Sequence, residues 1–199
     1  MPVIVINDAE KAIPLAEALL EAGMDWIEIT LRTDSAIEAI ERIAKSVPEM
    51  RVGAGTVLTE TLAQKSIDAG ASFGLAPGLS LTIVDLFKSA QVPFIPGVCT
   101  PTDITSATEH GIRKLKFFPA EASGGVTFLK SANAPFKSFG ITYCPTGGIN
   151  DMNMVDYLRL PEVFTVGGSW LATPDQISEG QWKIITEQTR TALAKAKQV

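Results

Sequence analysis

The 199-residue sequence has few of the residues that build metal sites or disulfide frameworks, since it contains one histidine and two cysteines. His110 lies in Glu109-His110-Gly111, a context typical of a helix end, so we assign it a surface or capping role. Cys99 and Cys144 lack the spacing of metal ligands, and a disulfide framework is unexpected in a chain of this kind. These shortages argue against a histidine-rich metal site, and we expect a protein that works without a metal or other cofactor.

An excess of basic residues and long apolar runs are also missing. Lysine and arginine number 17 against 22 aspartate and glutamate residues, for a net charge of -5, whereas nucleic-acid-binding proteins carry a basic surface. No stretch approaches the about 20 apolar residues that cross a bilayer, and the first residues do not resemble a signal peptide. We therefore expect a cytoplasmic protein that binds a small molecule rather than nucleic acid or a membrane.

Short β-branched runs alternate with amphipathic helical stretches along the whole chain. The predicted strands are residues 3–6, 26–31, 51–57, 72–76, 93–99, 114–118, 142–146 and 163–167. The predicted helices are residues 9–22, 34–46, 59–70, 81–90, 102–109, 127–132, 153–158 and 178–197. No linker or low-complexity tract divides them, so residues 1–199 are predicted to form one domain.

The even spacing of these units predicts a parallel sheet, because each strand is followed by a helix. Eight such units favour a closed (β/α)8 barrel over the alternative, a doubly wound open sheet. Active sites of such barrels lie at the carboxyl ends of the strands. We therefore expect the functional polar residues near those ends and on the inward faces.

A carboxylate falls on one face of the second predicted strand. Alternation places Trp26, Glu28 and Thr30 on this face, which we take as the inward one. A buried carboxylate is costly unless it is paired or functional. Two interpretations stay open for Glu28, a structural ion pair with a lysine across the barrel and a proton-transfer role in catalysis.

Two lysines fall on one face of the sixth predicted strand. Alternation groups Lys114, Lys116 and Phe118, and burial favours the neutral amine that forms a Schiff base. Lys116 lies nearer the carboxyl end of the strand, where substrate enters, whereas Lys114 is expected at the solvated bottom rim. Its position near the carboxyl end of the strand therefore makes Lys116 the candidate nucleophile.

The third predicted strand contains small residues on both faces. We expect Ala54 and Thr56 to point inward, where they leave room for a substrate and where Thr56 offers a hydroxyl. Gly53 and Gly55 are then expected to point outward and to allow close approach of a helix.

Glycine-rich turns follow the last two predicted strands. Gly147 and Gly148 follow the seventh strand, and Gly168 and Ser169 follow the eighth, which are the positions where such barrels bind phosphate through backbone N–H groups. Arg32 follows the second strand, where it either clamps a carboxylate or forms a surface ion pair.

Six segments resemble the KDPG/KHG aldolase family (KDPG is 2-keto-3-deoxy-6-phosphogluconate), in the same order and over essentially the whole chain. They are Ile27–Thr33, Val52–Leu58, Pro96–Thr102, Lys116–Glu121, Pro145–Ile149 and Gly167–Leu171. The segments Glu28-Ile-Thr-Leu-Arg32 and Lys116-Phe-Phe-Pro-Ala-Glu121 are specific to that family. The resemblance implies a (β/α)8 class I aldolase of the Entner–Doudoroff pathway that yields pyruvate and glyceraldehyde 3-phosphate.

The resemblance also implies a role for each candidate residue. Lys116 corresponds to the Schiff-base lysine and Glu28 to the general acid/base. The substrate-binding positions are Arg32 and Thr56 on the carboxylate side, Pro77 and Phe118 in the wall, and Gly147, Gly148, Gly168 and Ser169 at the phosphate. A serine after the last glycine pair is more similar to the gluconate-type enzymes than to their galactonate relatives.

The resemblance implies a homotrimer, and the chain starts almost at its first strand, where many relatives carry an extra N-terminal helix. One alternative function is an isomerase or epimerase of a small phosphosugar, in which Glu28 is the base and Lys116 acts only by its charge. Another is a phosphosugar sensor without turnover. The configuration at C4 of the substrate and the use of unphosphorylated 4-hydroxy-2-oxoglutarate stay open.

Overall fold

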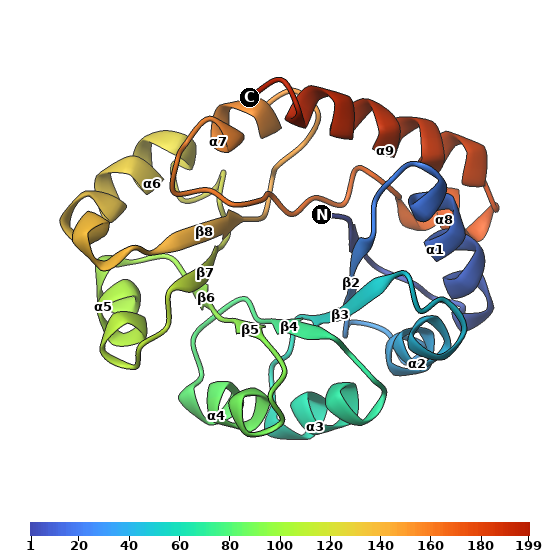
Figure 1. Ribbon diagram of the computed structural model, residues 1–199, viewed down its shortest axis with the longest axis horizontal. Helices are drawn as coiled ribbons and strands as arrows, with labels where there is room; N and C mark the ends of the chain where they lie inside the picture. Colours follow the sequence, from blue (N-terminus) through green and yellow to red (C-terminus); the bar gives the residue numbers. More distant parts are fainter.

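A computed structural model describes residues 1–199, with short parallel strands in an inner ring and helices around them (Figure 1). The strands are β1 (Val3–Ile4), β2 (Trp26–Thr30), β3 (Arg51–Gly55), β4 (Phe73–Leu75), β5 (Phe94–Ile95), β6 (Gly97–Val98), β7 (Lys114–Phe117) and β8 (Thr142–Pro145). The helices are α1 (Ala12–Glu21), α2 (Ala36–Ser46), α3 (Glu60–Asp68), α4 (Leu81–Ser89), α5 (Pro101–Glu109), α6 (Gly125–Asn133), α7 (Met154–Leu158), α8 (Pro174–Ser178) and α9 (Trp182–Ala196).

The strands form two parallel sheets, one ordered β1-β2-β3-β4-β5 and the other β6-β7-β8. The sequence predicted a single fifth strand over residues 93–99. This prediction is wrong, because Pro96 divides the segment into β5 and β6. Proline has no backbone N–H to give to a ladder, although the Pro96 carbonyl accepts a hydrogen bond from the Lys116 N–H at 2.8 Å. β5 and β6 therefore occupy together the place of one strand in the ring.

The segment predicted as the eighth strand, residues 163–167, forms isolated bridges instead of a regular strand. Parallel bridges join Tyr143 to Val163, Thr146 to Gly167, and Pro2 to Gly168. The segment thus lies between β8 and the start of the chain, so the ring closes without one continuous closed sheet. A doubly wound sheet would leave two open edges, whereas these bridges join the two ends of the strand order. The predicted (β/α)8 fold is therefore confirmed.

Apolar side chains on the outward faces of the strands pack against the helices. Ile27, Ile29 and Ala54 belong to a cluster of 25 buried residues, and Leu115 and Tyr143 belong to a second cluster of 18. Full burial of one such aliphatic side chain contributes about 1.5–3 kcal/mol. This outer layer leaves the inward faces free for polar residues.

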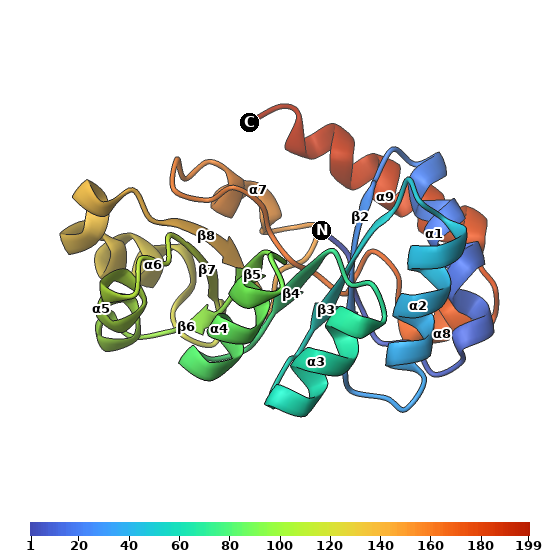
Figure 2. The same cartoon turned by 60° about the horizontal axis from the view of Figure 1, so that its bottom comes forward.

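α9 shows how the helices pack in the outer layer, and α5 shows how one of them begins and ends. α9 lies beside α1 in the outer layer (Figures 1 and 2), where the Thr186 hydroxyl donates a 2.9 Å hydrogen bond to the Ala18 carbonyl. α5 begins with a capping box between Thr100 and Asp103 and ends at His110, which is exposed. The predicted capping role of the one histidine is confirmed.

The faces of β3 are reversed relative to the sequence prediction. Ala54 points outward into the helix layer, whereas a side chain on Gly53 would lie 2.2 Å from the Phe73 ring and one on Gly55 would lie 2.1 Å from Glu28 Oε1. The glycines are therefore on the inward face, because Phe73 and Glu28 already fill the barrel there. Thr56 follows the strand with a φ of 59°, so strand alternation no longer decides its direction.

Candidate active site

Lys116 and Glu28 meet inside the barrel from strands on different sheets. The Lys116 Nζ lies 3.1 Å from Glu28 Oε1, and the two side chains are 5% and 0% exposed. Lys114, two residues earlier on β7, is exposed at the bottom rim and lies over the Phe164 ring. The predicted inward face of Lys116 is confirmed, Lys116 is buried where Lys114 is exposed, and the ion pair across the barrel exists.

The second oxygen of the Glu28 carboxylate has no hydrogen-bond partner. Oε2 is fully buried, whereas Oε1 accepts the contact from Lys116. Leaving a buried acceptor unsatisfied costs about 1–3 kcal/mol, which a purely structural ion pair would not require. The free oxygen is an acceptor available for a water molecule or a substrate hydroxyl beside the lysine.

Cys144 is a neighbour of this pair that the sequence reasoning overlooked. Its Cα is the β8 partner of the Lys116 Cα in the parallel register, so both side chains point into the barrel. Burial raises the pKa of the Cys144 thiol, which keeps it uncharged. The sequence does contain a signal for this inward position, because alternation along residues 142–146 places Cys144 and Thr146 on the same face of the strand. Glu28 is therefore the only ionic partner of Lys116.

Gly55 has no side chain, and the Glu28 carboxylate occupies the space that a side chain there would fill. In Gly55→Ala, the new Cβ would overlap Glu28 Oε1, so the carboxylate must move away from Lys116. We expect at least about a tenfold lower kcat, together with a loss of about 1–3 kcal/mol in stability from overpacking. Steady-state kinetics and thermal unfolding measure the two effects.

Gly53→Ala is the matched control, because the atoms nearest to its new Cβ belong to the Phe73 ring instead of to Glu28. It should lower the stability without the same loss of kcat in the folded enzyme. Equal losses of kcat in both variants would contradict a specific role for Gly55.

Backbone N–H groups without acceptors line the two glycine-rich turns. The N–H groups of Gly147, Gly148 and Ile149 donate no hydrogen bond within the chain, and neither do those of Ser169 and Trp170. The parallel bridge from Thr146 to Gly167 places the two turns side by side. Several free N–H groups close together suit an anion such as phosphate.

The other predicted positions lie at the carboxyl ends of strands. Arg32 is exposed after β2 and forms no ion pair within the chain, so the alternative of a surface ion pair is not realised. Thr56 follows β3 and Pro77 follows β4, and both are half-buried. Phe118 follows β7, and its ring centroid lies 5.6 Å from the Lys116 Nζ.

The structure contains neither a cluster of metal-binding residues nor a helix that could span a membrane. No group of three or more histidine, cysteine, aspartate or glutamate residues lies close enough together to hold a metal ion. None of the helices combines the length and the apolar character needed to cross a membrane.

A parallel barrel with a buried lysine–carboxylate pair and neighbouring N–H-lined turns defines the class of barrel enzymes that can form an imine with a carbonyl compound. The sequence model of the family described as KDPG and KHG aldolase matches residues 1–188, and the chain belongs to this family. The resemblance stated from the sequence is thus confirmed, and the protein is a carbon–carbon lyase of the aldolase type.

Close relatives carry the same family name. The chain is 42% identical over 197 residues to the KHG/KDPG aldolase of Escherichia coli K12, which covers 99% of this chain and 92% of the relative. It is 44% identical over 196 residues to the 2-dehydro-3-deoxy-phosphogluconate aldolase of Dickeya dadantii, with 98% and 91% covered.

Solved structures agree with these relatives. The KDPG aldolase of Legionella pneumophila, with pyruvate captured at low pH as a covalent carbinolamine intermediate, superimposes with a TM-score of 0.92 at 40% identity. The match covers 96% of this chain and 92% of that one. The KDPG aldolase of Zymomonas mobilis with 3-phosphoglycerate superimposes with a TM-score of 0.86 at 38% identity, covering 96% and 89%.

Proposed function

We propose that the protein is a class I aldolase that cleaves 2-dehydro-3-deoxy-6-phosphogluconate to pyruvate and glyceraldehyde 3-phosphate. The observation that carries the proposal is the buried 3.1 Å contact between Lys116 and Glu28, in which one carboxylate oxygen stays free. The names of the relatives and the carbinolamine in the Legionella pneumophila enzyme support the same chemistry.

The Lys116–Glu28 contact provides both the nucleophile and the acid for imine formation. Transfer of one proton from the Lys116 ammonium to Glu28 leaves a free amine beside a neutral carboxylic acid. The amine attacks the C2 ketone to form a carbinolamine. Glu28, directly or through a water molecule, then gives its proton to the departing hydroxyl, which leaves as water when the imine forms.

The imine serves as the electron sink for carbon–carbon cleavage. Glu28, again a carboxylate, takes the proton of the C4 hydroxyl, so the C3–C4 bond breaks and its electron pair moves to the imine nitrogen. The aldehyde leaves, and Glu28 returns the proton it took, directly or through a water molecule, to C3 of the remaining enamine. Addition of water to the resulting imine releases pyruvate and regenerates Lys116, so this course needs no metal or other cofactor.

The ends of the substrate are assigned to two groups of residues. The phosphate binds at Gly147, Gly148, Gly168 and Ser169. The N–H groups of Gly147, Gly148 and Ser169 are free and support an anion site, whereas the Gly168 N–H donates to the Met1 carbonyl at 3.1 Å. The carboxylate binds at Arg32 and Thr56, since the Arg32 guanidinium has no ionic partner within the chain. Pro77 and Phe118 form the wall beside the lysine.

A coupled assay tests the substrate. Pyruvate release, followed with lactate dehydrogenase and NADH, is expected with 2-dehydro-3-deoxy-6-phosphogluconate at a higher kcat/KM than with its C4 epimer or with 4-hydroxy-2-oxoglutarate. A clear preference for the epimer would contradict the gluconate assignment and leave the aldolase mechanism intact. Absence of pyruvate with all three compounds would refute the proposed reaction.

We extend the proposal to the assembly and location of the protein. It is a single (β/α)8 domain over residues 1–199 that works as a homotrimer in the cytoplasm, with the small-molecule substrate as its ligand. The family resemblance supports the trimer, and the acidic composition supports a partner other than nucleic acid.

A further inference from the structure

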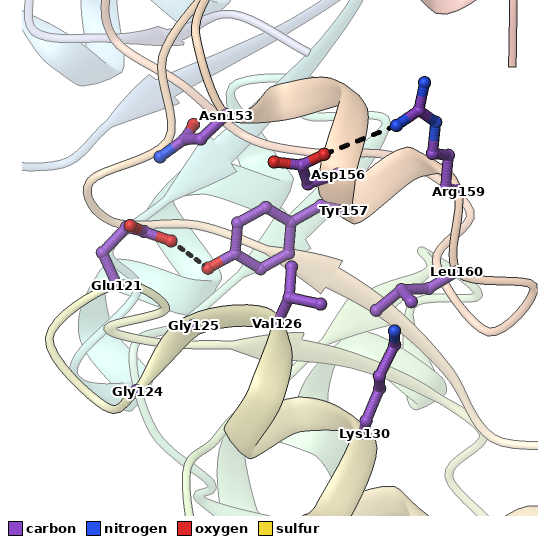
Figure 3. A pocket seen from close by; sticks show the side chains of 10 residues that line it. All are labelled: Glu121, Gly124, Gly125, Val126, Lys130, Asn153, Asp156, Tyr157, Arg159 and Leu160. Carbon is purple, nitrogen blue, oxygen red and sulfur yellow. Dashed lines mark hydrogen bonds and ion pairs between the residues drawn. The ribbon is translucent and has the colours of Figure 1, made fainter.

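Glu121 and Asn153 contact the Gly147–Gly148 turn, and Tyr157 hydrogen bonds to Glu121. The proposed mechanism uses none of these three residues. Glu121, Asn153 and Tyr157, which we call the outer brace, lie at the wall of a cavity of about 520 Å³ between α6 and α7. Glu121 and Tyr157 point toward each other across this wall (Figure 3). The brace thus approaches the turn from the side of α6 and α7.

Glu121 packs directly against the turn. Its N–H donates a 3.0 Å hydrogen bond to the Gly147 carbonyl. A side chain on Gly148 would lie 2.6 Å from the Glu121 Cβ, and the φ of Gly148 is 81°. The stem of Glu121 therefore takes the place of a Gly148 side chain, and the position of one residue sets the position of the other.

Tyr157 in turn holds Glu121. Its hydroxyl donates to Glu121 Oε1, and no other group in the chain hydrogen bonds to that carboxylate. Tyr157 is 1% exposed and lies on α7, the helix that follows the turn. Burial, and the Glu121 carboxylate itself, raise the pKa of Tyr157, so the hydroxyl stays a donor.

Asn153 fixes the second carbonyl of the turn. Its Nδ2 donates to the Gly148 carbonyl at 3.1 Å, and its Oδ1 accepts from the Asn150 N–H at 2.8 Å. In a trans peptide the C=O of one residue and the N–H of the next point in opposite directions. The Glu121 backbone N–H holds the Gly147 carbonyl and the Asn153 side chain holds the Gly148 carbonyl. The N–H groups of Gly148 and Ile149 therefore point the other way and stay free.

We propose that Glu121 and Tyr157 are positioning residues that set the affinity for the phosphate group of the substrate. They orient the N–H donors of the Gly147–Gly148 turn and do not touch the reacting atoms. The brace thereby favours phosphorylated over unphosphorylated substrates. This inference rests on the proposed function, because it assigns the turn to the substrate phosphate.

The test compares a phosphorylated substrate with a half-reaction that lacks phosphate. In Tyr157→Phe and Glu121→Ala, the KM for 2-dehydro-3-deoxy-6-phosphogluconate should rise about five- to tenfold while kcat changes less than twofold. The exchange of pyruvate methyl protons in D2O, which needs only the Lys116 imine, should keep its rate. Glu121→Gln retains an acceptor for Tyr157 and should keep the KM within twofold.

Tyr143→Phe is the matched control. Tyr143 is the other tyrosine of the chain, it is fully buried, and its hydroxyl donates a 3.0 Å hydrogen bond to Asn133 Oδ1 away from the turn. Its loss should affect stability and leave the KM unchanged. Because Glu121 is exposed, Glu121→Ala keeps the test valid if Tyr157→Phe folds poorly.

Three results would overturn the inference. These are an unchanged KM in both brace variants, an equal loss of KDPG cleavage and pyruvate exchange, and an equal rise of KM in Tyr143→Phe. All three leave the proposed function standing, because the unmodified enzyme still cleaves the phosphorylated substrate. An unmodified enzyme that does not cleave it would refute the proposed function first, and the inference with it.

Discussion

Lys116→Ala is expected to lower kcat/KM for aldol cleavage by about 10⁴-fold or more, because the covalent route through the imine is lost. Borohydride added with pyruvate should reduce the imine and attach pyruvate to Lys116 of the unmodified enzyme, as peptide mass spectrometry detects. The variant should take up no label. It should also be less stable, since removal of one partner of a buried ion pair costs about 3–5 kcal/mol.

Lys114→Ala is the control for this result. Lys114 is on the same strand and has the same parity, but it is exposed at the bottom rim. The Lys114→Ala variant should keep its activity and should still take up the label at Lys116. Full activity in Lys116→Ala would refute the Schiff-base mechanism. Turnover of a phosphosugar without any trapped imine would instead favour the isomerase or epimerase, in which Lys116 acts only by its charge.

Glu28→Gln should separate imine formation from carbon–carbon cleavage. The amide oxygen can still accept a hydrogen bond from Lys116, but the side chain can no longer take the C4 hydroxyl proton. Loss of a general base lowers the rate about 10²–10⁴-fold, so we expect a decrease of this size in kcat. Borohydride trapping of pyruvate on Lys116 should persist at a reduced rate, measured as label against time.

Thr30→Val is the control for Glu28→Gln. Thr30 is buried on the same strand and face, and its hydroxyl donates a 2.7 Å hydrogen bond to the Ile4 carbonyl. Its loss should lower stability with little change in the rate of cleavage. A kcat in Glu28→Gln within tenfold of the unmodified enzyme would assign the base to another group.

The sequence by itself determined the class of fold and the two residues at its centre. Strand alternation is a local property, since successive side chains point to opposite faces, and it placed Lys116 and Glu28 inward from their own strands alone. The regular recurrence of strand and helix predicted a parallel barrel for the same reason. The position of each lysine along the strand was sufficient to separate Lys116 from Lys114, because the sequence shows where that strand begins and ends.

The tertiary structure decided what fills the barrel and what supports it. Gly53 and Gly55 point inward because Phe73 and Glu28 from neighbouring strands occupy that space, which no pattern within β3 reveals. The 3.1 Å contact between Lys116 and Glu28 joins residues 88 positions apart, and the hydrogen bond from Tyr157 to Glu121 joins residues 36 positions apart. Such contacts depend on the register and packing of distant segments, and only the folded chain brings them together.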